Sequence, residues 1–152
     1  MTMKRVFFIV FCVLATGCTR IELPNYIKDV HPYDRRVYAP FEKTLKATSK
    51  VLDETGWTIT TSSEPSVFER AKYAVSPDTK QIMLFTKVKH TPLILWSTYK
   101  RINVILRSAG ENATDVEVRH VTVTSIPFKS FYSYKKDRVA NQLLEKIENA
   151  VK

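Results

Sequence analysis

The spacing of apolar and polar residues predicts two helices separated by a run of strands. Apolar residues recur every three or four positions over 40–56, where Pro40 suits a helix start and Gly56 a helix end. The same spacing over 133–152 predicts a second amphipathic helix. Elsewhere, apolar and polar residues alternate as in half-buried strands. The predicted strands are 35–39, 57–61, 67–75, 81–90, 99–107 and 116–124, with turns at 62–66, 76–79 and 109–112.

The order of these elements limits the architecture. A sheet with one apolar face and two amphipathic helices buries most apolar surface when both helices cover the same face. We therefore predict an α+β fold, helix-grip-like, with an antiparallel sheet of about five strands and two amphipathic helices on one face. The other face is expected to be left to solvent or to a partner. Residues 35–152 are assigned to this single domain.

The longest apolar run lies before this domain, close to the N-terminus. It covers residues 6–14, follows Lys4 and Arg5, and is succeeded by three small residues and then Cys18. A nine-residue helix is about 14 Å long, whereas crossing a hydrocarbon core of about 30 Å takes about 20 apolar residues. The run therefore fits the core of a signal peptide and not a transmembrane helix.

This segment resembles the lipobox of bacterial lipoproteins, in which small residues precede a Cys. The resemblance implies cleavage between Gly17 and Cys18, and acylation of Cys18 with fatty chains such as palmitate. Residues 1–17 are then the signal peptide, and residues 18–34 the acylated Cys and a tether. Thr19 replaces the Asp that retains enterobacterial lipoproteins in the inner membrane, which implies the outer membrane and its periplasmic face. The alternative is an ordinary secretory signal that leaves the thiol free.

Charge and side-chain chemistry narrow the class of function. The net charge is +9, and in an exported protein this suits anionic lipid head groups, cell-wall polymers or an acidic protein face, and not nucleic acid. Simple solubility is the alternative explanation of the charge. We expect no metal, no cofactor and no enzymatic activity, because the His residues lack metal-ligand spacing and the Ser residues lack nucleophile-elbow surroundings. The residues considered were His31, His90 and His120, and Ser97, Ser125 and Ser130.

Two apolar stretches stand where polar connections are expected. Residues 91–99 join two predicted strands, and residues 125–134 join the sheet to the last helix. If exposed, they form apolar patches with a basic rim, as at partner or membrane contacts. If buried, they pack in the core beneath the helices. The candidate partner or lipid contacts are Leu93, Leu95, Trp96, Phe128, Phe131 and Tyr132, and the rim is Lys89, Lys100, Lys129 and Lys135.

A second resemblance covers residues 36–61. The sequence over 37–47 and 51–59 resembles the start of BamC-like lipoprotein domains and related small periplasmic lipoproteins. In those domains a strand leads into a Pro-aromatic-acidic helix start, and the helix stops at Gly-aromatic before the next strand. The resemblance implies a helix-grip-like α+β domain without enzymatic activity.

Three functions follow as hypotheses. The first is an outer-membrane-anchored periplasmic lipoprotein that acts by binding, as an accessory or structural component of an envelope complex. The second is a carrier of a lipid or small apolar ligand in the groove between the sheet and the helices. The third is an envelope hydrolase. Exposure of the apolar stretch 91–99 favours the first, and an enclosed cavity behind Phe85, Leu106 and Leu143 favours the second.

Overall fold

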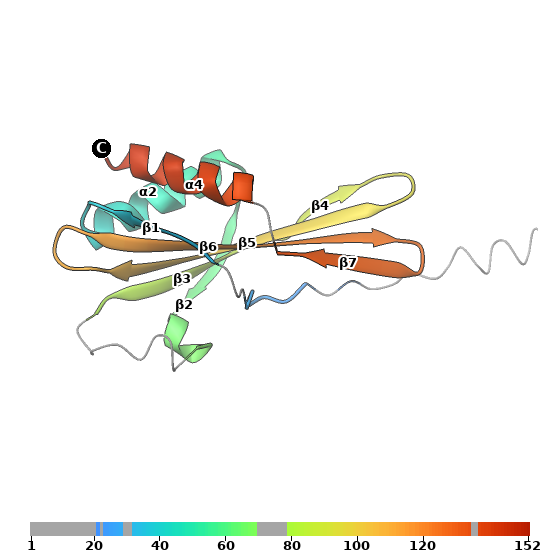
Figure 1. Cartoon of the computed structure of the whole chain (residues 1–152), viewed down its shortest axis with the longest axis horizontal. Helices are drawn as coiled ribbons and strands as arrows, with labels where there is room; N and C mark the ends of the chain where they lie inside the picture. Colours follow the sequence, from blue (N-terminus) through green and yellow to red (C-terminus); the bar gives the residue numbers. More distant parts are fainter. Residues whose placement is uncertain (1–20, 22, 29–31, 70–78, 135–136) are drawn as a thin grey trace, which may run out of the picture.

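In the described part of the chain, seven antiparallel strands form one sheet and two helices lie on one of its faces, in agreement with the predicted α+β class (Figure 1). The computed structural model describes residues 21, 23–28, 32–69, 79–134 and 137–152. The predictions about Gly17, Cys18 and Lys135 lie outside these residues. The elements are β1 (Tyr33–Val37), α2 (Phe41–Glu54), β2 (Ile59–Ser63), the 3-10 turn η1 (Pro65–Val67), β3 (Gln81–Thr86), β4 (Lys89–Pro92), β5 (Ser97–Ser108), β6 (Thr114–Ile126), β7 (Lys129–Ser133) and α4 (Asp137–Ala150).

The first helix begins and ends where its sequence predicts. Pro40 is the N-cap, and the helix starts one residue later. At the other end, Gly56 adopts a φ of 72°, a conformation that glycine reaches without the steric cost of a Cβ. The Gly56 N–H donates to the Asp53 carbonyl at 2.8 Å, and the Trp57 N–H donates to the Leu52 carbonyl at 2.7 Å. This pair of bonds is the Schellman arrangement, which satisfies the last carbonyls of α2.

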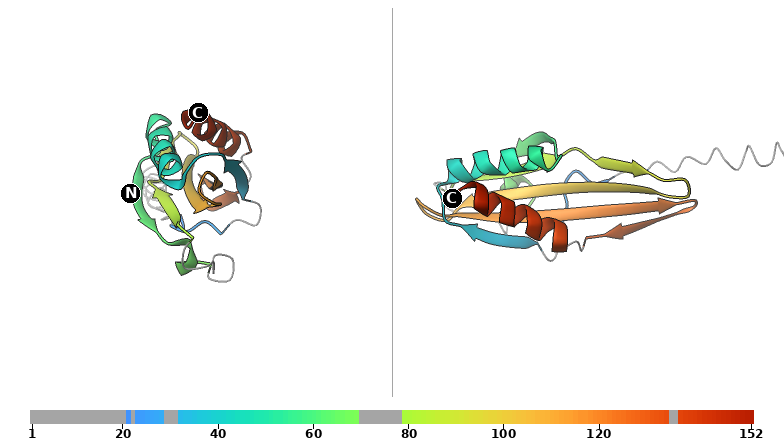
Figure 2. Two further views of the ribbon diagram at one scale, coloured as in Figure 1. Left: turned by 90° about the vertical axis from the view of Figure 1, so that its left-hand side faces the viewer. Right: turned by 90° about the horizontal axis from the view of Figure 1, so that it is seen from above.

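Both helices pack on the same face of the sheet, as predicted (Figure 2). Leu52 of α2 and Leu144 of α4 are fully buried against alternate residues of the two longest strands, including Leu106 of β5 and Val118 of β6. Each such buried side chain stabilises the fold by about 1.5–3 kcal/mol relative to an exposed one. The helix-covered half of the sheet is therefore the stable base of the molecule.

The opposite face of the sheet is not left to solvent, which corrects the sequence-based expectation. Residues 23–28 pack across it, and Ile27 is fully buried with Val121 and Val123. Tyr26 packs beside a second buried cluster, which contains Phe85. In its described part, the region 18–34 is therefore not a free tether. The sequence of this segment shows no apolar period, because the segment packs through single side chains and not through a regular apolar face. Its packing therefore could not be predicted from apolar spacing.

Polar side chains of the sheet hold this N-terminal segment in place. Arg101 donates from Nη1 to the Pro24 carbonyl at 2.8 Å and to Asn25 Oδ1 at 2.7 Å. The Asn103 amide donates to the Asn25 carbonyl at 3.0 Å. Arg119, which is fully buried, donates to the Ile27 carbonyl at 3.0 Å. Two rows of the sheet, that of Arg101 and that of the paired Asn103 and Arg119, thus bind the backbone of the segment.

Several strand boundaries differ from the predicted ones. The predicted strand 81–90 is broken after Thr86, because the buried Thr86 hydroxyl bonds both the carbonyl and the N–H of Ile102 in place of the backbone ladder. The predicted strand 67–75 does not begin at Val67, which belongs to η1, and residues 70–75 lie outside the described part. The short strands β4 and β7 were not predicted.

Candidate functional site

The sheet extends well beyond the two helices as a four-stranded part that the helices do not cover, here named the blade (Figures 1 and 2). It consists of residues 89–100 and 122–134, in the strand order β4-β5-β6-β7. It exists because β5 and β6 are 12 and 13 residues long and continue past the base, where β4 and β7 pair with them. From the base outward, its four rows are Lys89, Lys100, Thr122 and Ser133; His90, Tyr99, Val123 and Tyr132; Thr91, Thr98, Thr124 and Phe131; and Pro92, Ser97, Ser125 and Ser130.

Two hairpin loops follow the outermost row and lie at the same end of the blade, here named the tip (residues 93–96 and 126–128). The β4–β5 loop is closed by the Leu93 N–H, which donates to the Trp96 carbonyl at 2.8 Å. Its side chains point to solvent: Ile94 is fully exposed, Leu95 is 67% exposed and Trp96 is 45% exposed. The hypothesis that residues 91–99 pack in the core is therefore wrong for this loop.

The β6–β7 loop presents Phe128, which is 86% exposed. Ile126 pairs with Lys129, so Pro127 and Phe128 form a two-residue turn. Phe128 has a φ of 69°, the region that the third position of a type II turn requires and that glycine normally supplies. A bulky residue in this region is a strained outlier. The chain thus places an aromatic side chain at the tip, although the backbone there adopts a conformation that favours glycine.

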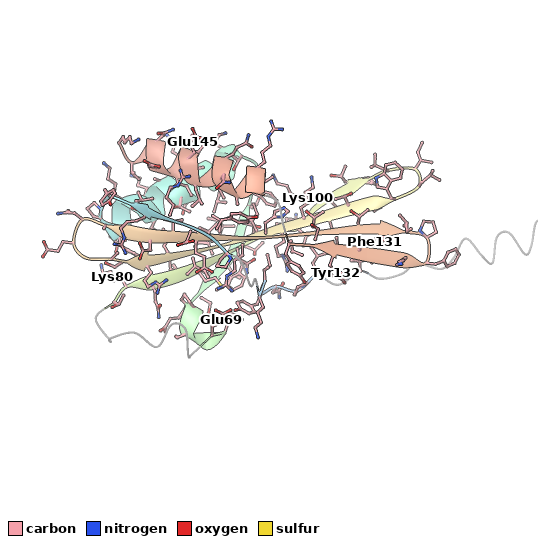
Figure 3. The ribbon with its side chains drawn as sticks, in the orientation of Figure 1. Glu69, Lys80, Lys100, Phe131, Tyr132 and Glu145 are labelled. Atoms are coloured by element: carbon pink, nitrogen blue, oxygen red, sulfur yellow. The ribbon has the colours of Figure 1, made fainter. Side chains whose placement is uncertain are left out.

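The two faces of the blade carry different aromatic residues. Phe131 lies on the helix side of the sheet, where Lys129 Nζ is 5.0 Å from its ring centroid. Tyr132 lies on the opposite side, in one row with Tyr99 (Figure 3). His90 stacks on Tyr99 with ring centroids 4.4 Å apart. Phe131 and Tyr132 are both exposed, so all six candidate contact residues lie on the blade and face solvent.

The charge of the blade has one sign. Residues 89–100 and 122–134 contain three Lys residues and no Asp or Glu. Lys89 lies at the root of the blade, where its ammonium is 3.9 Å from the centroid of the Trp57 ring and donates to the Thr55 carbonyl at 2.9 Å. Burial, together with the charge of Lys100, lowers the pKa of Lys89. Lys89 therefore fastens the blade to the end of α2 and is not part of an exposed rim.

Among the described residues, no cluster of metal-binding side chains forms, and the three candidate Ser residues have no activating side chain in their row. They contain no group of three or more His, Cys, Asp or Glu residues that could hold a metal ion. Ser97, Ser125 and Ser130 are aligned in the outermost row, an alignment that their positions in the sequence do not reveal. That row contains neither a His nor an acidic residue to activate a hydroxyl. Within the described part of the chain, no helix is both long and apolar enough to cross a membrane.

The groove between sheet and helices does not resemble a carrier site. Leu106 and Leu143 are buried in the helix-side core, whereas Phe85 packs on the opposite face, so the three do not enclose a common cavity. A pocket of about 160 Å³ opens between the helix ends, which is smaller than the roughly 300–1,000 Å³ of typical ligand pockets. It is lined by Thr55, Trp57, Val139, Gln142, Leu143 and Lys146.

A larger hollow of about 490 Å³ lies at the other end of the sheet and is lined mainly by charged residues. Across it, Arg36 donates from Nε to Asp115 Oδ1 at 2.7 Å and from Nη2 to Oδ2 at 3.1 Å. This two-point bond lowers the pKa of the Asp115 carboxyl and keeps it ionised. An apolar ligand would have to strip water from these charges, which makes the hollow unsuitable for one.

Comparisons with known proteins leave the structure as the main guide to function. No model of a known protein family matches the chain, and no curated protein matches it. The resemblances to the lipobox and to BamC-like domains therefore stay predictions.

Proposed function

We propose that this protein is an outer-membrane-anchored periplasmic lipoprotein that acts by binding, as an accessory or structural component of an envelope complex. The observation that supports binding most strongly is the blade, on which all six candidate contact residues are exposed. Soluble proteins rarely expose contiguous apolar patches unless these meet a protein or a membrane. The apolar tip is therefore best explained as a contact surface.

The division of the molecule into base and blade suits this role. The base buries an apolar core on each face of the sheet, although Tyr38, Val67 and Phe68 are exposed on it. The blade projects from it and carries basic and aromatic side chains without acidic ones. The carrier hypothesis is less well supported, because the pockets described above are small or charged.

The lipid anchor is tested by the Cys18→Ala variant. We expect it to lose incorporation of a labelled fatty acid and to leave the membrane fraction, while its circular dichroism and melting temperature stay unchanged because Cys18 precedes the folded segments. A Cys18→Ala protein that still fractionates with membranes and keeps its signal peptide would contradict the lipobox assignment.

Contact through the blade is tested by a photo-crosslinking amino acid placed at Tyr132 in cells. Tyr132 is exposed on the blade, and Glu145 is exposed on α4 of the base, so the same amino acid at Glu145 is a matched control (Figure 3). We expect a crosslinked protein or lipid of the envelope from position 132 and none from position 145. Equal crosslinking at both positions, or none at either, would refute the blade as the binding surface.

A further inference from the structure

The order of side chains along the blade follows the depth profile of a membrane surface. The tip is apolar, and the outermost row below it contains the hydroxyls of Ser97, Ser125 and Ser130. Tyr99 and Tyr132 come two rows further in, and Lys100 lies in the row after them. At about 3.3 Å per residue, the four rows span about 10 Å. In membrane proteins, Tyr and Trp side chains favour the boundary between the acyl chains and the lipid head groups.

The charge of the blade suits an anionic leaflet. Lys100 and Lys129 flank the apolar tip, and neither blade segment contains an acidic residue. Basic residues close to a membrane surface gain from the negative potential of anionic lipids, and this gain falls off within a Debye length of about 8–10 Å. Lys129 pairs with Ile126 at the tip itself, and Lys100 lies about 13 Å from Trp96 along β5, at about 3.3 Å per residue.

The proposed anchor can reach the same end of the molecule. The N-terminal segment crosses the sheet from the Arg119 level, through Arg101, toward the blade, and Ile21 packs in the cluster that includes Tyr99 (Figure 1). Cys18 lies three residues before Ile21. Three residues span at most about 10 Å, and Tyr99 lies about 7 Å from the outermost row. An acyl chain on Cys18 would therefore enter the membrane beside the tip.

The strained turn at Phe128 agrees with a function at the tip. Glycine would fit its φ of 69° without strain, yet the chain places there an aromatic ring that is 86% exposed and makes no core contact. Strain of this kind persists where a side chain has a role outside the fold. An exposed ring at the far end of a blade can contribute only to something beyond the molecule.

From these observations we propose that the tip inserts into the same membrane leaflet that anchors Cys18, with Ile94, Trp96 and Phe128 among the acyl chains and Lys100 and Lys129 at the head groups. The inference rests on the proposed lipid anchor. A lipid occupant is favoured over a protein because residues 93–96 carry no polar side chain beyond the Trp96 indole, whereas protein interfaces include about one hydrogen bond per 100–200 Å². The blade thus holds the base at a fixed distance from the membrane.

The two Trp residues of the chain allow a direct test. Trp96 is at the tip, and Trp57 is 6% exposed in the base. A Trp57→Phe protein reports Trp96 alone, and a Trp96→Phe protein reports Trp57 alone. Each is purified as the mature acylated protein and reconstituted into phosphatidylethanolamine–phosphatidylglycerol vesicles with or without brominated acyl chains. Should Trp57→Phe fail to fold, the signal of Trp96 is obtained by subtracting the Trp96→Phe spectrum from that of the wild type.

We expect bromolipids to quench Trp96 severalfold more than Trp57, and the Trp96 emission to shift to shorter wavelength on reconstitution. An acylated, vesicle-bound protein whose Trp96 stays accessible to iodide and insensitive to bromolipid overturns the insertion alone. Trp96 that is shielded in native envelope membranes but not in lipid vesicles assigns the tip to a protein partner and also overturns it. A mature protein whose mass shows no acyl chains overturns the anchor and the insertion together.

Discussion

Arg119 is the residue on which the second face of the sheet depends most. Its guanidinium is fully buried and binds Glu117 Oε1 at 2.6 Å and Glu69 Oε1 at 3.0 Å. It also donates to the Tyr26 hydroxyl at 2.9 Å, and that hydroxyl in turn donates to Glu69. A buried cation needs such partners, because transfer of an unpaired charge from water is very costly. One side chain therefore links β6, the segment after η1 and the N-terminal segment.

Replacing Arg119 should destabilise the whole domain. Arg119→Met removes the cation that binds the buried Glu117, and breaking a buried ion pair in this way costs about 3–5 kcal/mol. Urea denaturation followed by circular dichroism measures the loss. The double variant Arg119→Met with Glu117→Gln is the control and should recover part of it. An Arg119→Met protein with the wild-type free energy of unfolding would show that the network is not needed for stability.

Among the helices and strands, the sequence predicts those in which apolar residues recur with a clear period. Both helices, the long strands β5 and β6, and the stop at Gly56 follow from apolar spacing and glycine geometry. The strands β4 and β7 do not, because they are four and five residues long and lack a regular alternation of apolar and polar residues. The dipeptide Pro127-Phe128 was their available signal, since Pro favours the second position of a tight turn.

The strained turn at the tip is expected to affect the stability of the protein. Phe128→Gly removes a left-handed strain of about 1–2 kcal/mol and adds a glycine entropy cost of about 0.5–1 kcal/mol. We expect the free energy of unfolding to rise by about 0.5–1 kcal/mol in chemical denaturation. Ser130→Gly, within the regular strand β7, is the matched control and should lower it. A destabilised Phe128→Gly protein would mean that the exposed ring serves the fold and not an external contact.

In the whole molecule, the base and the blade differ in how far the sequence predicts them. The base follows from the packing of two amphipathic helices on a sheet, and the sequence predicts it. The contact residues are predictable as an apolar stretch, but their exposure depends on which strand ends extend past the helices. Even less predictable is the N-terminal segment, because its carbonyls bind Arg101, Asn103 and Arg119 from distant strands. Because residues 23–28 pack on the sheet, only a short stretch of chain separates them from Cys18, the proposed site of the lipid anchor.

We propose that this short connection and the blade together set the protein on the membrane by its tip. The most direct test compares Trp96 with Trp57 in the acylated, vesicle-bound protein, using lipids brominated near the head group or deep in the acyl chain. We expect bromines in the acyl chains to quench Trp96 and neither lipid to quench Trp57. Equal insensitivity of both residues to both lipids, in a protein shown to be acylated and bound, would contradict it.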